Sequence, residues 1–151
     1  MIVRTTESVV VDAAPAEVFP FVAALDEYPH WLRLVHEADL VESEPAPTWS
    51  VEIRARVGPF ARSKRLRMAR TQFEPDRMVE FERAEIDGRD HARWALRVEL
   101  EANDEQATLV TMHLAYDGGL WTGGLLERVL DEEIRRGRAG LVDLVSAEPT
   151  R

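Results

Sequence analysis

Two arginines end apolar strand faces, where a charged side chain needs a polar partner. In a segment that alternates between apolar and polar residues, Arg70 follows Leu66 and Met68 at every second position. Arg83 follows Phe81 with the same spacing in the next segment. Burying an unpaired guanidinium is costly, so each arginine is expected to lie near an anion or a carbonyl oxygen. Both arginines are therefore candidates for holding an oxygen atom, either of a ligand or of the protein itself.

A candidate partner for these arginines stands in the last segment of the chain. Residues 119–147 are predicted to form one long helix, because their apolar residues recur at helical spacing. Glu133 lies in the apolar sector of this helix, one turn before Gly137. Its carboxylate either reaches an exposed edge or faces a partly polar hollow, where it would be a candidate partner for Arg70 or Arg83.

Two glycines interrupt the same apolar stripe. Gly137 and Gly140 leave part of the inner helix face without side chains. Each glycine costs about 1 kcal/mol of helix stability relative to alanine, so a packing or cavity explanation is expected. We expect these glycines to enlarge a cavity beneath the helix.

Other catalytic and metal-binding patterns in the sequence are incomplete. His36 and Glu37 begin like a zinc-protease motif, but the second histidine is missing. Residues 118–124 are rich in glycine but lack the Lys-Ser/Thr pair of a phosphate-binding loop, so a hinge before the helix explains them better. The chain has no cysteine, which excludes disulfides, thiolate metal ligands and cysteine nucleophiles. We therefore predict no metal and no cofactor.

The charge and hydropathy of the chain restrict its partners. The net charge of −9 opposes binding to nucleic acid or to an anionic membrane surface. The arginines of residues 54–67 are expected to pair with acidic residues on neighbouring strands, so no nucleic-acid partner is predicted. No run of about 18 apolar residues is present and no secretory leader is recognised, which favours a cytoplasmic protein without stable membrane insertion.

The order of alternating and helical segments predicts the architecture that would position these residues. Strands are expected at residues 2–11, 35–42, 48–57, 60–73, 77–86, 92–100 and 108–116, with a short helix beginning at Pro15, a second at 27–33 and the long helix last. Every strand from Thr48 onward has one apolar face that needs a cover, and only the last helix is long enough to provide it. We predict one α+β domain over residues 1–151, with a curved antiparallel sheet of about seven strands wrapped on the C-terminal helix and a cavity between them.

The opening stretch DAAPAEVFPFVAALDEYPHW, together with this order, resembles the helix-grip fold of the START/Bet v 1-like (SRPBCC) superfamily. The resemblance covers nearly the whole chain. It implies a cavity between sheet and helix that holds a hydrophobic small molecule. Members of the superfamily include lipid carriers, hormone receptors, isoprenoid-quinone chaperones and bacterial polyketide aromatase/cyclases.

The aromatase/cyclase branch resembles this chain at the two arginines. Members carry an inward arginine four residues after a large apolar residue, which matches Leu66 and Arg70, and another on the next strand, which matches Arg83. The resemblance implies that Arg70 and Arg83 stabilise enolate oxygens during aldol cyclisation and dehydration, while Glu133 or His36 moves a proton. The chain departs from the branch at two positions. The tyrosine that is proposed as an acid in the branch falls near Val35 here, and Leu66 replaces the bulky tryptophan of the long strand.

The principal hypothesis is therefore a cytoplasmic protein, monomeric or homodimeric, that binds a polyketide, aromatic, isoprenoid or lipid-like molecule. The residues expected to contact this ligand are Trp31, His36, Trp49, Ile53, Leu66, Met68, Phe81, Trp94, Met112, Leu130 and Gly137. The buried aromatic residues among them would fit core packing equally well. The alternative is a metal-free polyketide cyclase or dehydrase that uses Arg70, Arg83 and Glu133 in the same cavity. A third interpretation is an interaction protein whose cavity is filled by its own side chains.

Overall fold

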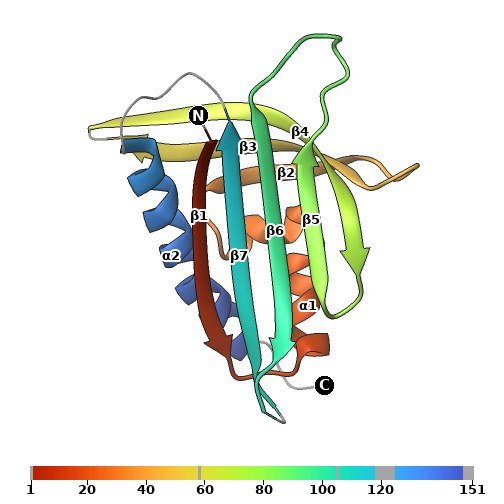
Figure 1. Ribbon diagram of the computed structural model, residues 1–151, viewed down its shortest axis with the longest axis vertical. Helices are drawn as coiled ribbons and strands as arrows, with labels where there is room; N and C mark the ends of the chain where they lie inside the picture. Colours follow the sequence, from red (N-terminus) through yellow and green to blue (C-terminus); the bar gives the residue numbers. More distant parts are fainter. Residues whose placement is uncertain (1, 58, 105, 118–124, 148–151) are drawn as a thin grey trace.

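The computed structural model describes residues 2–57, 59–104, 106–117 and 125–147. In chain order the elements are β1 (Ile2–Val11), α1 (Pro15–Val22), the 3-10 helix η1 (Leu25–His30), β2 (Val35–Glu42), β3 (Thr48–Val57), β4 (Phe60–Glu74), β5 (Met78–Arg83), β6 (Arg93–Ala102), β7 (Thr108–Asp117) and α2 (Leu125–Ala147). The seven strands form one antiparallel sheet in the order β1-β7-β6-β5-β4-β3-β2 (Figure 1). The predicted helix-grip architecture is confirmed; residues 118–124, expected to hold a hinge and the helix start, lie outside the described residues.

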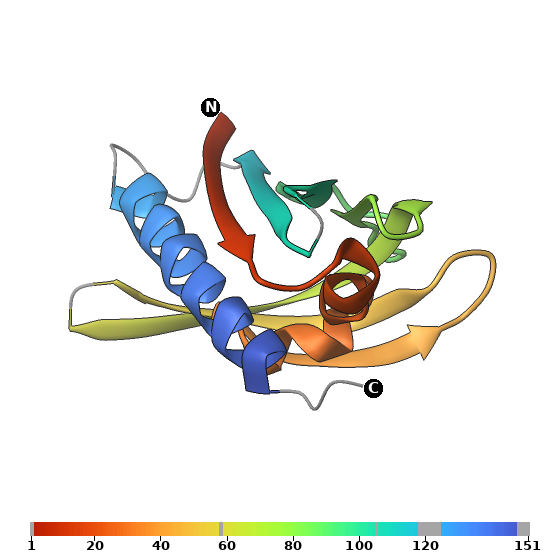
Figure 2. The ribbon, with the colours of Figure 1, turned by 90° about the horizontal axis from the view of Figure 1, so that it is seen from below.

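The sheet curves around α2, with α1 and η1 beside the helix on the same side (Figure 2). Period-two alternation produces this arrangement, since β7 buries every second residue from Thr108 to Tyr116. The core side of α2 is apolar, with Leu130, Ile134 and Leu141 each no more than 1% exposed. The buried sheet face and the buried helix stripe therefore share one core.

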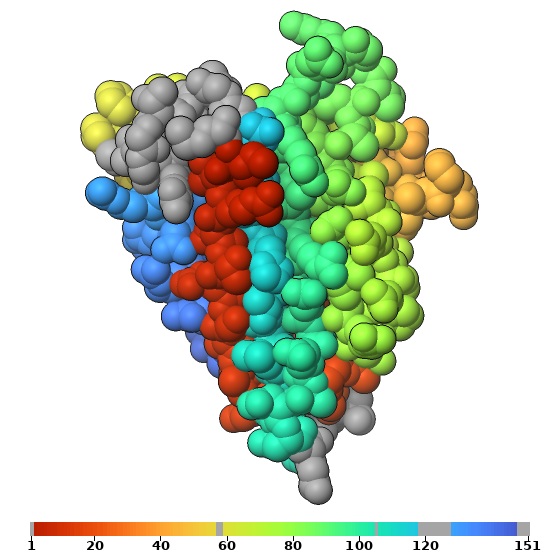
Figure 3. Space-filling model, viewed as in Figure 1, coloured from red at the N-terminus to blue at the C-terminus, as the bar shows by residue number. Residues whose placement is uncertain are grey.

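Polar contacts along β1 hold α2 at the edge of the sheet. The Thr5 hydroxyl donates to Asp131 Oδ1 at 2.6 Å, and Arg138 Nη1 donates to the carbonyl oxygen of Ser8 at 2.7 Å. The outer faces of β1, β7, β6 and β5 lie side by side in Figure 3.

One strand is shorter than predicted. The strand expected at 77–86 ends at Arg83, and residues 84–92 form a loop that projects beyond the sheet (Figure 1). Two local features accompany the end of this strand. The Arg83 side chain donates a hydrogen bond to the Glu85 carboxylate, and Gly88 adopts a φ of 73° in a bend. The sequence pattern predicted a strand as far as Ile86, but beyond Arg83 the bond between Arg83 and Glu85 and the bend at Gly88 hold the chain in a loop instead.

The two glycines of α2 do not enlarge a cavity, so that expectation was wrong. A Cβ built at Gly137 would lie 2.4 Å from Leu32 Cδ1, and one at Gly140 would lie 2.4 Å from the carbonyl oxygen of Trp31. The absent side chains let the segment after η1 pack directly on the helix. Close approach of two segments, rather than ligand space, explains both glycines.

We expect Gly140→Ala to destabilise the protein, although the same change in an unobstructed helix is stabilising by about 1 kcal/mol. The new Cβ meets the Trp31 carbonyl oxygen, a backbone atom that cannot rotate away. Gly137→Ala should cost less, because it meets the far end of the Leu32 side chain. Urea unfolding of both variants measures the difference, and a Gly140→Ala protein as stable as wild type would contradict the close contact.

Candidate functional site

An apolar cavity of about 40 Å³ lies between the sheet and α2. Its lining comes from the segment around η1 and β2 and from β3, β4, β6, β7 and α2, and consists of Leu25, Leu32, Leu34, Val35, Val51, Ile53, Leu66, Met68, Trp94, Leu96, Leu114 and Ile134. No lining residue in the described part of the chain is titratable. Pockets that hold drug-sized ligands are roughly 300–1,000 Å³, so the cavity in this structure is far smaller than such a pocket.

Four of the predicted ligand-contacting residues lie in this lining. They are Ile53, Leu66, Met68 and Trp94, which alternation places on the inner faces of β3, β4 and β6. Phe81, Met112 and Leu130 are buried in the surrounding core instead. Ligand contact by any of these residues remains a prediction.

The other predicted contact residues have different surroundings. Trp31 Nε1 donates to the Phe21 carbonyl oxygen at 2.9 Å, and Trp49 Nε1 donates to Asp26 Oδ1 at 2.8 Å. His36 is exposed beside an irregularity in the pairing of β2 with β3. The two indoles therefore hold α1 and η1 in place, and His36 lies outside the cavity lining.

Arg70 is held by the end of α1. Its Nη1 donates to the carbonyl oxygen of Ala23, the residue that follows the helix, at 2.9 Å. Its guanidinium carbon lies 4.1 Å from the centre of the Phe73 ring, a distance suited to a cation–π contact. Burial lowers the pKa of the Arg70 guanidinium below its ordinary value. The expected carbonyl partner is thus a backbone group of the protein.

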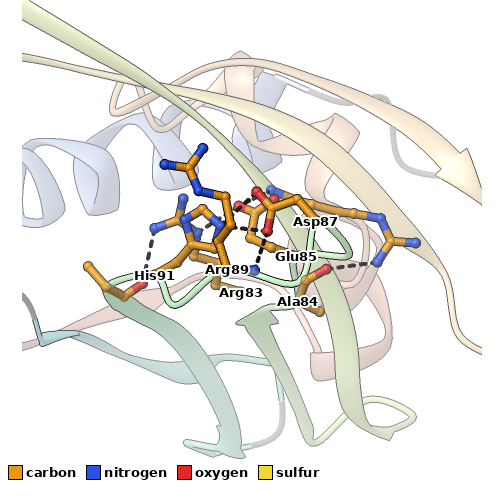
Figure 4. Close-up of polar contacts among 8 residues, drawn as sticks. Arg83, Ala84, Glu85, Asp87, Arg89 and His91 are labelled. Carbon is orange, nitrogen blue, oxygen red and sulfur yellow. Dashed lines mark hydrogen bonds and ion pairs between the residues drawn. The ribbon is translucent and has the colours of Figure 1, made fainter.

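Arg83 has only 6% of its side chain exposed and has a protein anion beside it (Figure 4). Its Nε donates to Glu85 Oε2 at 2.7 Å, and its Nη1 donates to the Ala92 carbonyl oxygen at 3.1 Å. The same Glu85 oxygen accepts the backbone N–H of Arg67 at 3.2 Å. Sequence reasoning missed Glu85, although the strand expected at 77–86 would have placed Glu85 on the same face as Arg83.

These bonds determine the ionisation of Glu85. Burial by itself would raise the pKa of the Glu85 carboxyl, but the hydrogen bond from Arg83 and the backbone bond from Arg67 outweigh burial and leave the pKa below the ordinary 4.5. Asp87 in the same loop binds His91 Nε2 at 2.9 Å, which lowers the pKa of the Asp87 carboxyl (Figure 4). The loop of residues 84–92 is thus held by two pairs of opposite charge when His91 is protonated.

Glu133 pairs with Arg33, so the predicted pairing with Arg70 or Arg83 was wrong. Arg33 donates from Nε to Oε1 and from Nη2 to Oε2, each at 2.8 Å. The Glu133 residue is 4% exposed, whereas the Arg33 side chain is 53% exposed. The hydrogen bonds that Arg33 donates to the Glu133 carboxylate raise the pKa of the Arg33 guanidinium. The carboxylate therefore meets a cation that reaches in from the edge and joins α2 to the segment after η1.

Among the described residues, no group of three or more His, Cys, Asp or Glu side chains is placed to share a metal ion. None of the described helices has the length and hydrophobicity needed to cross a membrane.

Residues 3–146 match the family described as "Polyketide cyclase / dehydrase and lipid transport". The chain belongs to this family. Membership confirms the resemblance to the SRPBCC superfamily that the opening stretch indicated. No curated protein matches the sequence.

Solved structures similar to this family member share its fold at low sequence identity. A START superfamily protein from Mycobacterium smegmatis has 13% identity and a TM-score of 0.75, with 95% of this chain and 97% of that chain covered. A protein from Thermus thermophilus has 17% identity and a TM-score of 0.77, with 97% and 99% covered. The Zhui aromatase/cyclase from Streptomyces sp. R1128 has 12% identity and a TM-score of 0.72, with 97% and 94% covered. At these identities the likeness establishes the fold alone.

We expect Arg33→Met to destabilise the protein by about 1–2 kcal/mol, because it leaves the buried Glu133 carboxylate unpaired while solvent near the exposed partner limits the cost. Arg136→Met is the matched control, since Arg136 pairs with Glu132 four residues earlier and both side chains are at least half exposed. That control should change the free energy of unfolding by less than about 0.5 kcal/mol. Equal effects in urea unfolding would contradict a structural role for the Arg33–Glu133 pair.

The lowered pKa of Glu85 predicts a pH dependence of stability. A carboxyl whose folded-state pKa lies below its unfolded value stabilises the fold fully above the unfolded value, near 4.5, and loses this contribution as pH falls through the folded-state pKa. Glu85→Gln should therefore be less stable than wild type at pH 7 and should approach it below pH about 4. Unfolding curves between pH 7 and pH 3 test this, with the exposed Glu101→Gln as control. Parallel pH curves for Glu85→Gln and wild type would contradict it.

Proposed function

We propose that the protein binds a hydrophobic small molecule in an enlarged form of the cavity between the sheet and α2. The observation that carries this proposal is the composition of the lining, which is wholly apolar and comes from every layer of the fold. An apolar molecule placed there would lose contact with water and would not deprive any charged lining group of its solvent. The chain belongs to a family described as "Polyketide cyclase / dehydrase and lipid transport". This membership supports the binding of a hydrophobic molecule.

Binding requires the cavity to grow. At about 40 Å³ the space is too small for a ring-bearing molecule. Met68 is the most adaptable side chain of the lining, because it is unbranched and rotates about three bonds. We propose that Met68 and the neighbouring leucines move aside when a ligand enters.

Binding is favoured over cyclase chemistry by the positions of the three candidate catalytic residues. Arg70 is bonded to the Ala23 carbonyl, Arg83 to Glu85 and Ala92, and Glu133 to Arg33. None of the three is among the lining residues. Aldol cyclisation needs groups that stabilise an enolate and move a proton at the reacting atoms, and such groups would first have to exchange these partners. The aromatase/cyclase alternative therefore rests on the likeness in fold and family.

The proposal is tested with N-phenyl-1-naphthylamine, a neutral apolar dye that fluoresces more strongly out of water. We expect saturable binding of one dye per chain. Leu114→Phe adds bulk to the lining and should weaken binding at least tenfold, whereas Val10→Phe on the exposed face of β1 should leave it unchanged. Thermal unfolding verifies that both variants are folded. Unchanged dye affinity in a folded Leu114→Phe variant would place the dye elsewhere and contradict the proposal.

A further inference from the structure

Two buried polar atoms lack hydrogen-bond partners, one on a residue that lines the cavity and one on the residue paired with it across the sheet. Trp94 Nε1 and Tyr116 Oη are both inaccessible to solvent, and neither has a partner within the described ranges. Trp94 is 8% exposed and Tyr116 is 2% exposed. The other buried indole and phenol groups of the described chain are satisfied, with Tyr28 bonded to Val22, Trp31 to Phe21 and Trp49 to Asp26. A buried donor without a partner is costly and uncommon, so this pair requires an explanation.

The two groups form one unit. Trp94 on β6 lies opposite Tyr116 on β7 in the antiparallel pairing, and their ring centroids are 4.6 Å apart. Trp94 itself lines the cavity, together with Leu96 on its own strand and Leu114 on the neighbouring one. Trp94 therefore brings the pair next to the cavity, near the start of β6 and the end of β7.

We infer that the ligand carries a neutral oxygen, of a ketone or hydroxyl group, that accepts hydrogen bonds from Trp94 Nε1 and Tyr116 Oη. This inference rests on the proposed function and specifies its ligand. An indole N–H can only donate and a phenol O–H can donate, while a carbonyl oxygen has two lone pairs and can accept both bonds. A pure hydrocarbon would leave both donors unpaired.

The charges nearby favour a neutral oxygen over a carboxylate. Glu82 pairs with Ala95, so Arg83 is at the register position beside Trp94 on the next strand. Its guanidinium is already bonded to the Glu85 carboxylate at 2.7 Å, and this carboxylate would repel a second anion. The lining offers no cation of its own. A carboxylate would thus be buried without a cation to balance its charge, whereas a neutral ketone or hydroxyl needs none.

The test compares three probes on one ring system: naphthalene, 2-acetylnaphthalene and 2-naphthoate at pH 7.5, measured by displacement of N-phenyl-1-naphthylamine. We expect the ketone to bind about tenfold more tightly than naphthalene and than the carboxylate, the difference that one or two well-made hydrogen bonds provide. Trp94→Phe and Tyr116→Phe should each reduce the ratio of ketone affinity to naphthalene affinity several-fold, because each removes a hydrogen-bond donor that only the ketone uses. Tyr28→Phe is the control, because its hydroxyl is bonded to Val22 and not to a ligand.

Stability of the ligand-free protein gives a second measurement. Tyr116→Phe removes an unpaired hydroxyl and should leave the unfolding midpoint unchanged or raise it, whereas Tyr28→Phe removes a bonded hydroxyl and should lower the midpoint. Equal affinity for the three probes, or a ketone preference that survives both Phe variants, would overturn the inference and leave the proposed function standing. Failure of every probe and of the dye to bind would overturn both.

Discussion

The close packing of α2 on the segment after η1 determines the shape of the interior. Because Gly140 and Gly137 have no side chains, the Trp31 backbone and the Leu32 side chain lie directly against the helix. The bidentate bond between Arg33 and Glu133 holds the next residue of the same segment to the helix. Three consecutive residues are therefore fixed to α2, and α2 in turn is bonded to β1 through Asp131 and Arg138.

This packing explains why the cavity is small. Leu32 and Leu34 project from the segment that α2 holds, and both are part of the cavity lining. Any enlargement of the cavity must therefore either move side chains on the sheet or loosen the contact between this segment and the helix. The first route is less costly, since Met68 can change rotamer while the second route would separate a buried carboxylate from its cation.

The fold could be predicted from the sequence because its signals are local. Alternation on β7 and the helical stripe of α2 determine which faces are buried, and the turn residues determine where most strands end. The site was less predictable, since it depends on which distant side chains meet. Glu133 could be placed on the apolar side of its helix, but its partner Arg33 is 100 residues away and is selected by how closely the glycines let two segments approach. Ile53, Leu66, Met68 and Trp94 were identified because alternation alone places them inward.

The polar groups of the interior separate into two sets with different roles. Arg70, Arg83 and Glu133 carry charge, and each is bonded to a group of the protein itself, as expected for ions whose burial would otherwise be too costly. Trp94 and Tyr116 are neutral, and an unpaired neutral donor is a cost that a folded protein can carry until a partner arrives. The residues with the greatest chemical reactivity are thus engaged in holding the fold, and the less reactive pair retains unused bonding capacity at the cavity. In the proposed site this pair would recognise a neutral oxygen by hydrogen bonding, while the charged groups stay bonded within the protein.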